Sequence, residues 1–363
     1  MPEVASDRFP CEQCGSQLQF QPGTDALVCP YCNHRQSIVS SADQVGERDF
    51  LRDLAEAERN AVSDEVTTLS CPGCGARFEL DARAQAGACP FCATPAVVDA
   101  GRTRRQRPQA LLPFKLDEST AREAFSSWLK GLWFAPNGLA RLARADRHFD
   151  GAYLPYWTFD SIAHVRYRGQ RGIEHRVPVR ERVEVNGKVE ERVTTRIEVR
   201  WTPVSGQLRL GFDDEIVAGS RSLPVNRVEA LSPWDLHELV DYRAEYLSGF
   251  RAELYTVTLE QGFDRMRDNV DGRIRGAVHA DIGGDRQRID QLQTRFSDVR
   301  YRLVLLPLWI AAFRFRDKVY RFLVNARTGE VQGDRPYSIW KIALAVGGAL
   351  LVVGAFGYLS GRF

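Results

Sequence analysis

Eight cysteines, all before residue 93, constrain this chain more than any other feature. They form four CxxC pairs, and in each half of the set fourteen residues separate one pair from the next. The second half repeats the first at an offset of sixty positions: Cys11, Cys14, Cys29 and Cys32 are followed by Cys71, Cys74, Cys89 and Cys92. Neighbours repeat as well, since Gly15 corresponds to Gly75 and Pro30 to Pro90. The segment is therefore a duplicated module.

The spacing of the cysteines predicts metal binding. A CxxC turn directs two thiolates at one point, and two such turns complete a tetrahedral four-sulfur site, with room for a β-hairpin between them. Disulfides are rare in reducing compartments, a redox pair needs only one CxxC, and the regular two-turn spacing favours zinc over an iron–sulfur cluster. We expect zinc ribbons at 1–40 and 69–100, each with one structural Zn²⁺. Four thiolates leave no open position for a catalytic water.

Length and composition indicate an ordinary folded protein. The 363 residues suit two or three units, and the 44% hydrophobic and 26% charged residues exclude wholesale disorder. A net charge of +2 gives no overall electrostatic argument for nucleic-acid binding. No apolar run follows the first Met, so we expect no secretory signal and a reducing compartment.

Two connecting segments are predicted around the second ribbon. The amphipathic pattern at 43–62 predicts a helical spacer within 41–68, with partner binding as the alternative. Residues 101–110 have the composition of a basic linker. Its four arginines are candidate contacts for phosphates of nucleic acid or anionic lipid, or are simply solvated: Arg102, Arg104, Arg105 and Arg107.

Residues 111–335 are predicted to form a mixed α+β region with antiparallel strands, as one domain or two related halves. Asp117 can cap a helix that follows it, and apolar residues recur at helical spacing from about 256 to 280. Asn186-Gly187 between two alternating arms predicts a β-hairpin. A short internal echo, Leu154–Trp157 and Leu306–Trp309, suggests duplication of a strand unit.

No motif of a known catalytic site is present in the sequence. It contains no GxxxxGK[ST] phosphate loop, no HExxH, no GxSxG and no GxGxxG after a strand. The six histidines are scattered without ligand spacing. We therefore expect that the protein is not an enzyme.

The C-terminal segment predicts a membrane anchor. Residues 342–359 are eighteen uncharged residues, which as a helix would be about 27 Å long, against about 30 Å for the bilayer core. Trp340 and Tyr358 are placed as interfacial anchors, whereas a buried core helix is the alternative. We expect one transmembrane helix at 338–360, with the N-terminal bulk in the cytoplasm and the protein at the cell membrane.

The ordered set of motifs resembles a bacterial family of uncharacterised zinc-ribbon membrane proteins. The matching segments are the cysteine turns, 112–114, 133–136, 151–157, 324–331 and 335–338. Members are often labelled as primosomal replication protein or superfamily II helicase. This sequence has no ATP-binding motif, so it does not support that label. The resemblance implies this architecture and no settled activity.

These features favour a tail-anchored adaptor that binds a protein partner at the cytosolic face of a membrane. The alternative is a replication-associated, nucleic-acid-binding zinc-ribbon protein without its own ATPase, which would use the ribbon hairpins and Arg102–Arg107 against phosphates. No small-molecule substrate is indicated.

Overall fold

The structure is a computed structural model of the whole chain. It describes residues 9–39, 46–57, 64–79, 89, 91–92, 94, 101–131, 149–185, 188–315, 318–334 and 339–359. Within these ranges the protein is a mixed α/β structure with mostly antiparallel sheets, as predicted.

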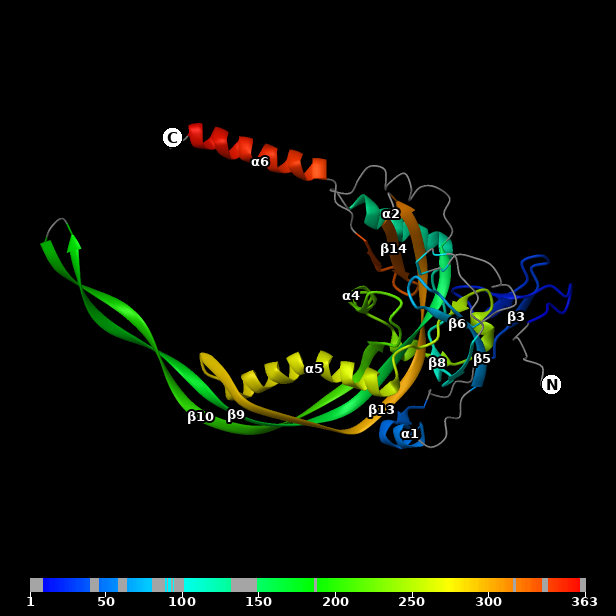
Figure 1. Cartoon of the computed structure of the whole chain (residues 1–363), viewed down its shortest axis with the longest axis horizontal. Coiled ribbons are helices and arrows are strands. Elements are labelled where there is room, and N and C mark those ends of the chain that lie inside the picture. Colours follow the sequence, from blue (N-terminus) through cyan, green and yellow to red (C-terminus); the bar gives the residue numbers. More distant parts are fainter. Residues whose placement is uncertain are drawn as a thin grey trace.

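A nine-stranded sheet organises the molecule (Figure 1). Its main path runs β10-β9-β13-β14-β15, and four two-residue strands join at its edges. The main strands are β9 (Asp150–Val185), β10 (Lys188–Ala218), β13 (Arg286–Phe315), β14 (Lys318–Asn325) and β15 (Val331–Gly333). The short ones are β4 (Arg48–Asp49), β8 (Ala110–Leu111), β11 (Val240–Asp241) and β12 (Arg251–Ala252). Leu154 pairs with Leu306, so the two echo segments meet within one sheet.

Strands β9 and β10 form a hairpin that extends beyond the rest of the sheet (Figure 1). Lys188 pairs with Val185, as the turn chemistry predicts, although Asn186 and Gly187 themselves lie outside the described residues. The third strand, β13, begins at Arg286 opposite Gly172. Residues 173–185 and 188–200 therefore pair only with each other, and we call this two-stranded part the arm.

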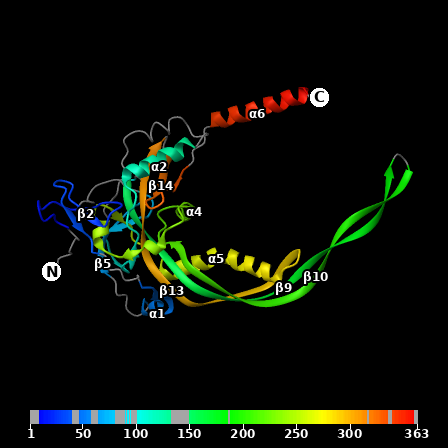
Figure 2. The same ribbon diagram turned by 180° about the vertical axis from the view of Figure 1, so that it is seen from behind.

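Helix α5 (Leu259–Ile282) lies inside the curve of the sheet (Figures 1 and 2). Thr258 caps its N-terminus through a reciprocal pair of hydrogen bonds with Gln261, and the predicted helix is thereby confirmed. Its buried face packs on odd-numbered residues of β9, which include Trp157 and Phe159. The opposite face of the sheet carries the even-numbered residues, because side chains alternate along a strand.

The two cysteine modules pack against opposite faces of the sheet base. The first, with β1 (Gln19–Phe20), β2 (Ala26–Val28) and β3 (Arg35–Ser37), shares a core with Tyr153 and other odd-numbered residues of the base. The second, with β5 (Asp64–Ser70), β6 (Arg77–Glu79) and β7 (Gly101–Arg105), shares one with Ala152, Leu154 and Tyr156. Each module thus obtains a larger apolar core than it could form alone.

The remaining helices are shorter. They are α1 (Phe50–Ala57), α2 (Glu118–Lys130), α4 (Val225–Glu229) and the 3-10 helices η1 (Leu236–Glu238) and η2 (Ala244–Leu247). Asp117 accepts a hydrogen bond from the Thr120 backbone N–H, which confirms the predicted cap of α2. The resemblance segment 133–136 lies outside the described residues.

The two connecting segments differ from their predictions. Of the helix predicted over 43–62, Phe50–Ala57 form α1 and Arg48–Asp49 form β4, whereas 43–45 and 58–62 lie outside the described residues. Residues 101–105 are not a linker but strand β7, which pairs with β5. In both segments the secondary structure depends on strand pairing with residues distant in sequence. Local composition carries no information about that pairing.

Helix α6 (Ile339–Leu359) follows the sheet at the C-terminal end (Figure 1). None of the helices in the described part of the chain is both long enough and apolar enough to cross a membrane. The described residues therefore do not support the transmembrane helix predicted over 338–360, a range that also reaches beyond them at both ends.

Candidate metal centres

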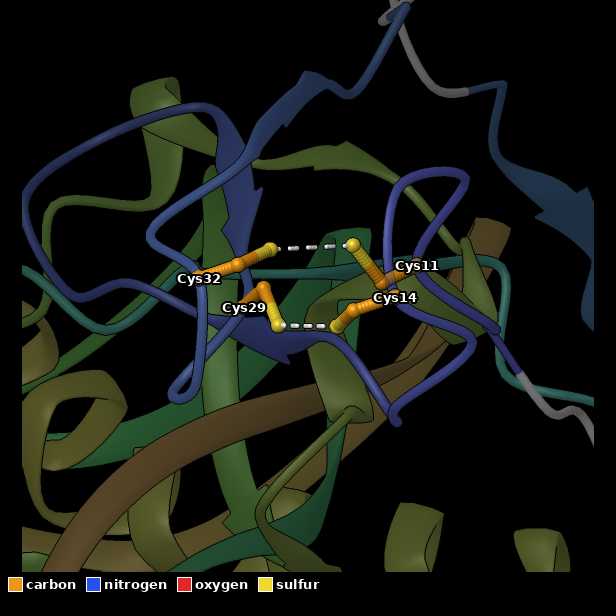
Figure 3. A group of neighbouring side chains, drawn as sticks. All are labelled: Cys11, Cys14, Cys29 and Cys32. Atoms are coloured by element: carbon orange, nitrogen blue, oxygen red, sulfur yellow. Dashed lines mark hydrogen bonds between the residues drawn. The ribbon is translucent and has the colours of Figure 1, made fainter.

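The first cluster brings together the four cysteines of the N-terminal module (Figure 3). The Sγ atoms of Cys11 and Cys32 are 3.5 Å apart, and those of Cys14 and Cys29 are 3.4 Å apart. All four lie within 4.8 Å of one another. The first turn closes with a hydrogen bond from the Gly15 backbone N–H to the Cys11 carbonyl, which requires the positive φ of Gly15.

The second cluster repeats this arrangement at the offset of sixty positions. The Sγ atoms of Cys71 and Cys92 are 3.4 Å apart, and those of Cys74 and Cys89 are 3.7 Å apart. The pairs therefore correspond one to one with those of the first module. Gly75 has the same positive φ as Gly15, so the duplication seen in the sequence holds for the backbone as well.

Both clusters have the dimensions of a single four-coordinate metal site. A tetrahedral ion with metal–sulfur bonds of about 2.3 Å places its ligands about 3.8 Å apart. The sulfur pairs at 3.4–3.7 Å come close to that edge, and all eight cysteines are free thiols. Two four-cysteine clusters suited to metal ions are therefore present where they were predicted.

Hydrogen bonding favours the thiolate form of one cysteine in each cluster. Burial raises the pKa of the Cys29 thiol, but hydrogen bonds from the backbone N–H groups of Cys32 and Tyr31 outweigh it and lower the pKa to about 6. In the second cluster the hydrogen bond with Cys89 lowers the pKa of Cys74 to about 5 and raises that of Cys89. A thiolate at neutral pH is the form that coordinates a cation.

The two clusters differ in exposure. In the first, Cys14 and Cys32 are exposed, whereas in the second only Cys74 is partly accessible. The second cluster also has a close neighbour in Thr94, whose Oγ1 lies 3.1 Å from the Cys92 Sγ. A Cβ at Gly73 would come within 2.5 Å of that oxygen. The second centre is therefore the more tightly enclosed.

The four candidate phosphate-binding arginines are divided between a strand and the segment that follows it. Arg102, Arg104 and Arg105 lie on β7, where Arg104 is opposite Glu65 and Arg105 is opposite Asp64. Arg107 lies outside the strand, and its guanidinium is 5.3 Å from the centre of the Tyr242 ring. Their phosphate role stays a prediction.

Two features of the sheet were not recognised from the sequence. One is the exposure of apolar residues along the arm, and the other is a group of unpaired arginines on the sheet face opposite α5. Both follow a period-two alternation within β9, β10 and β13. Such alternation shows that two faces exist, but the pairing register is needed to show which residues gather on each.

Fold and clusters together define a mixed α/β protein with two four-cysteine modules, each suited to hold a metal ion, built onto one long antiparallel sheet. The chain is similar to the uncharacterised protein YdjG of Bacillus subtilis (strain 168), with 25% identity over 336 residues that cover 92% of each chain. No protein-family profile matches the chain, and no solved structure matches it. Nothing in these comparisons concerns a primosomal protein or a helicase.

Proposed function

We propose that this protein is a membrane-tethered zinc-ribbon adaptor that binds a protein partner through its arm. The observation that carries the proposal is a row of exposed apolar side chains along β10. Val193 is 65% exposed, Ile197 is 53% exposed and Trp201, at the base of the arm, is 42% exposed. Even spacing along a strand puts all three on one face.

The structure of the arm gives a physical reason to expect that it binds a partner. A two-stranded ribbon is at best marginally stable in water, and exposed Val, Ile and Trp add unfavourable apolar surface. Trp is also among the residues that most often dominate binding energy. Strand β10 forms one end of the main strand order, so its outer edge is available for an added strand. A protein partner would cover both features.

We assign a structural Zn²⁺ to each cysteine cluster. Four thiolates at tetrahedral spacing form a complete coordination shell, which suits zinc in a scaffolding role. The ions would hold the two modules on opposite faces of the sheet base. The arm would then project from a rigid sheet base.

The predicted transmembrane segment 338–360, which reaches beyond the described residues of helix α6 at both ends, stays our proposal for the tether, with the rest of the chain in the cytoplasm. Its described apolar side chains are exposed rather than packed on the protein, and they include Leu344, Leu350, Leu351 and Phe356 at 67–76%. Arg335 and Lys341 precede the apolar stretch, which favours an N-terminal side in the cytoplasm. A reducing cytoplasm would also keep the cysteines available for metal.

Site-specific photocrosslinking in the native host tests the adaptor role. A crosslinker at position 193 or 197 should capture the same protein, and Trp201→Ser should abolish its capture. A crosslinker at Arg275, on the outer side of α5, is the matched exposed control. Equal capture of that protein from position 275, or none from the arm, would reject the proposal.

Fractionation tests the tether separately. The full chain should remain in the membrane fraction after carbonate extraction, and a chain that ends at residue 334 should be released. Elemental analysis should find two zinc ions per chain. A full chain found in the supernatant would reject the tether but leave the arm hypothesis intact.

A further inference from the structure

The sheet face opposite α5 carries a regular array of polar side chains. Pairing of β10, β9 and β13 aligns three successive rows across the strands. The rows are Arg209, His164 and Arg295; Gln207, Arg166 and Gln293; and Ser205, Arg168 and Gln291. We call these nine residues the arginine–glutamine face. All nine are exposed, whereas Ala163, Val165 and Tyr167, which alternate with them on β9, are buried beneath α5.

The charge of this face is not neutralised. It contains four arginines and no carboxylate, and within the described part of the chain none of the four forms an ion pair or a side-chain hydrogen bond. The arginines beyond the array behave differently. Arg286 pairs with Glu174 at 2.7 Å, and Arg300 lies 3.8 Å from Glu47. Along β13, the arginines on either side of the array are therefore paired with carboxylates.

We propose that the arginine–glutamine face binds the phosphate backbone of double-stranded nucleic acid. Neighbouring strands are about 4.8 Å apart, and alternate residues along a strand are about 6.8 Å apart. A duplex strand carries a phosphate about every 3.4 Å along its axis, so the rows recur at about twice the phosphate spacing. Arginine, glutamine and serine side chains are all common donors to phosphate oxygens.

The composition of the face favours this ligand over three others. The only aromatic ring among the nine is the imidazole of His164, which is hydrogen-bonded to the Ser297 hydroxyl at 2.9 Å, so successive single-stranded bases would find no row of stacking platforms. None of the nine residues is apolar, whereas proteins that lie on anionic membranes combine basic residues with inserted apolar ones. An acidic protein surface would satisfy the charge but has no regular charge repeat. The face carries no base-reading geometry, so binding should be independent of sequence.

The test uses the full-length protein in non-ionic detergent and a labelled random-sequence duplex of about 20 base pairs. Four arginine–phosphate contacts predict a salt slope of about −3.6, which is a loss of roughly 150-fold between about 50 and 200 mM salt. The variant Arg166→Gln, Arg168→Gln, Arg209→Gln and Arg295→Gln should bind at least tenfold more weakly at the lower salt concentration, with a much shallower slope. Because these side chains form no ion pair or side-chain hydrogen bond with any described residue, the thermal melting of the variant should match that of the wild type.

A matched control removes the same number of exposed arginines from the arm. This variant carries Arg176→Gln, Arg192→Gln, Arg196→Gln and Arg200→Gln and should bind the duplex within about twofold of the wild type. Equal weakening of both variants would overturn the proposal, and so would no duplex binding by the wild type. Face-dependent binding of poly-glutamate or of anionic phosphatidylglycerol vesicles in preference to the duplex would overturn it in favour of an acidic protein or a membrane.

Discussion

Phe78 of the second cysteine module forms a β-bridge with Glu253 in the segment that follows β12. The corresponding residue of the first module, Leu18, accepts a hydrogen bond from the Ser248 hydroxyl at 2.6 Å. Equivalent positions of the duplicated module therefore contact one short segment, 248–253, from its two ends. A shift of either module would displace this shared segment, so we expect the two cysteine clusters to be coupled through it.

Loss of one metal centre should therefore weaken the whole base of the sheet. Cys89→Ser removes a ligand that is only 2% exposed, and metal binding supplies much of the folding energy of such modules. We expect metal content to fall from two ions to one per chain and the melting temperature to drop. Elemental analysis and calorimetry measure both. Cys14→Ser, at an exposed ligand, is the comparison and should lower the melting temperature less.

The two ions should leave in a fixed order on chelation. Cys14 and Cys32 are exposed in the first centre, whereas three of the four ligands are buried in the second. A chelator should therefore remove one ion quickly and the other slowly. Biphasic release from the wild type, with only the slow phase left in a Cys14→Ser variant, checks this. Loss of the slow phase instead would show that the second centre is the labile one.

Stability should depend on pH through Glu253. Complete burial raises the pKa of its carboxyl to about 8, although hydrogen bonds from Ser220 and Ser222 act in the opposite direction. The folded state therefore holds a proton that the unfolded state releases near pH 4.5, so this group makes folding less favourable as pH rises from about 4.5 to 8.

Glu253→Gln removes that titration while keeping a hydrogen-bonding side chain. The stability of the variant relative to the wild type should increase across pH 5 to 8, measured by urea unfolding at a series of pH values. Parallel pH profiles of the two proteins would contradict this assignment. Ser222→Ala, which keeps the carboxyl, is the control and should retain the wild-type trend.

Two glycines of α5 should respond oppositely to alanine. A Cβ at Gly262 would lie 2.8 Å from Cδ1 of Trp157, which is fully buried and donates a hydrogen bond to the Val257 carbonyl at 3.0 Å. Gly262→Ala should therefore destabilise the protein by about 1–3 kcal/mol. Gly276 has no atom near its added Cβ, so Gly276→Ala should stabilise by up to about 1 kcal/mol. Thermal or urea unfolding of both variants measures the contrast.

Features that depend on short-range chemistry could be predicted from the sequence. The cysteine clusters follow from ligand spacing, the start of α2 from the Asp117 cap, and the β9–β10 hairpin from its turn residues. Features that depend on distant partners could not. The basic stretch 101–105 resembled a linker because nothing within it specifies that β5 lies alongside.

The sequence by itself determined which residues can hold metal and where helices and hairpins begin, since those interactions join residues only a few positions apart. Only the tertiary structure decided that the two modules pack on opposite faces of one sheet. It also decided that the arm projects alone and that four arginines meet on an uncovered face. The reason is register: side chains on different strands become neighbours only when distant residues are paired, 37 to 45 positions apart between β9 and β10 on this face and more than a hundred between β9 and β13.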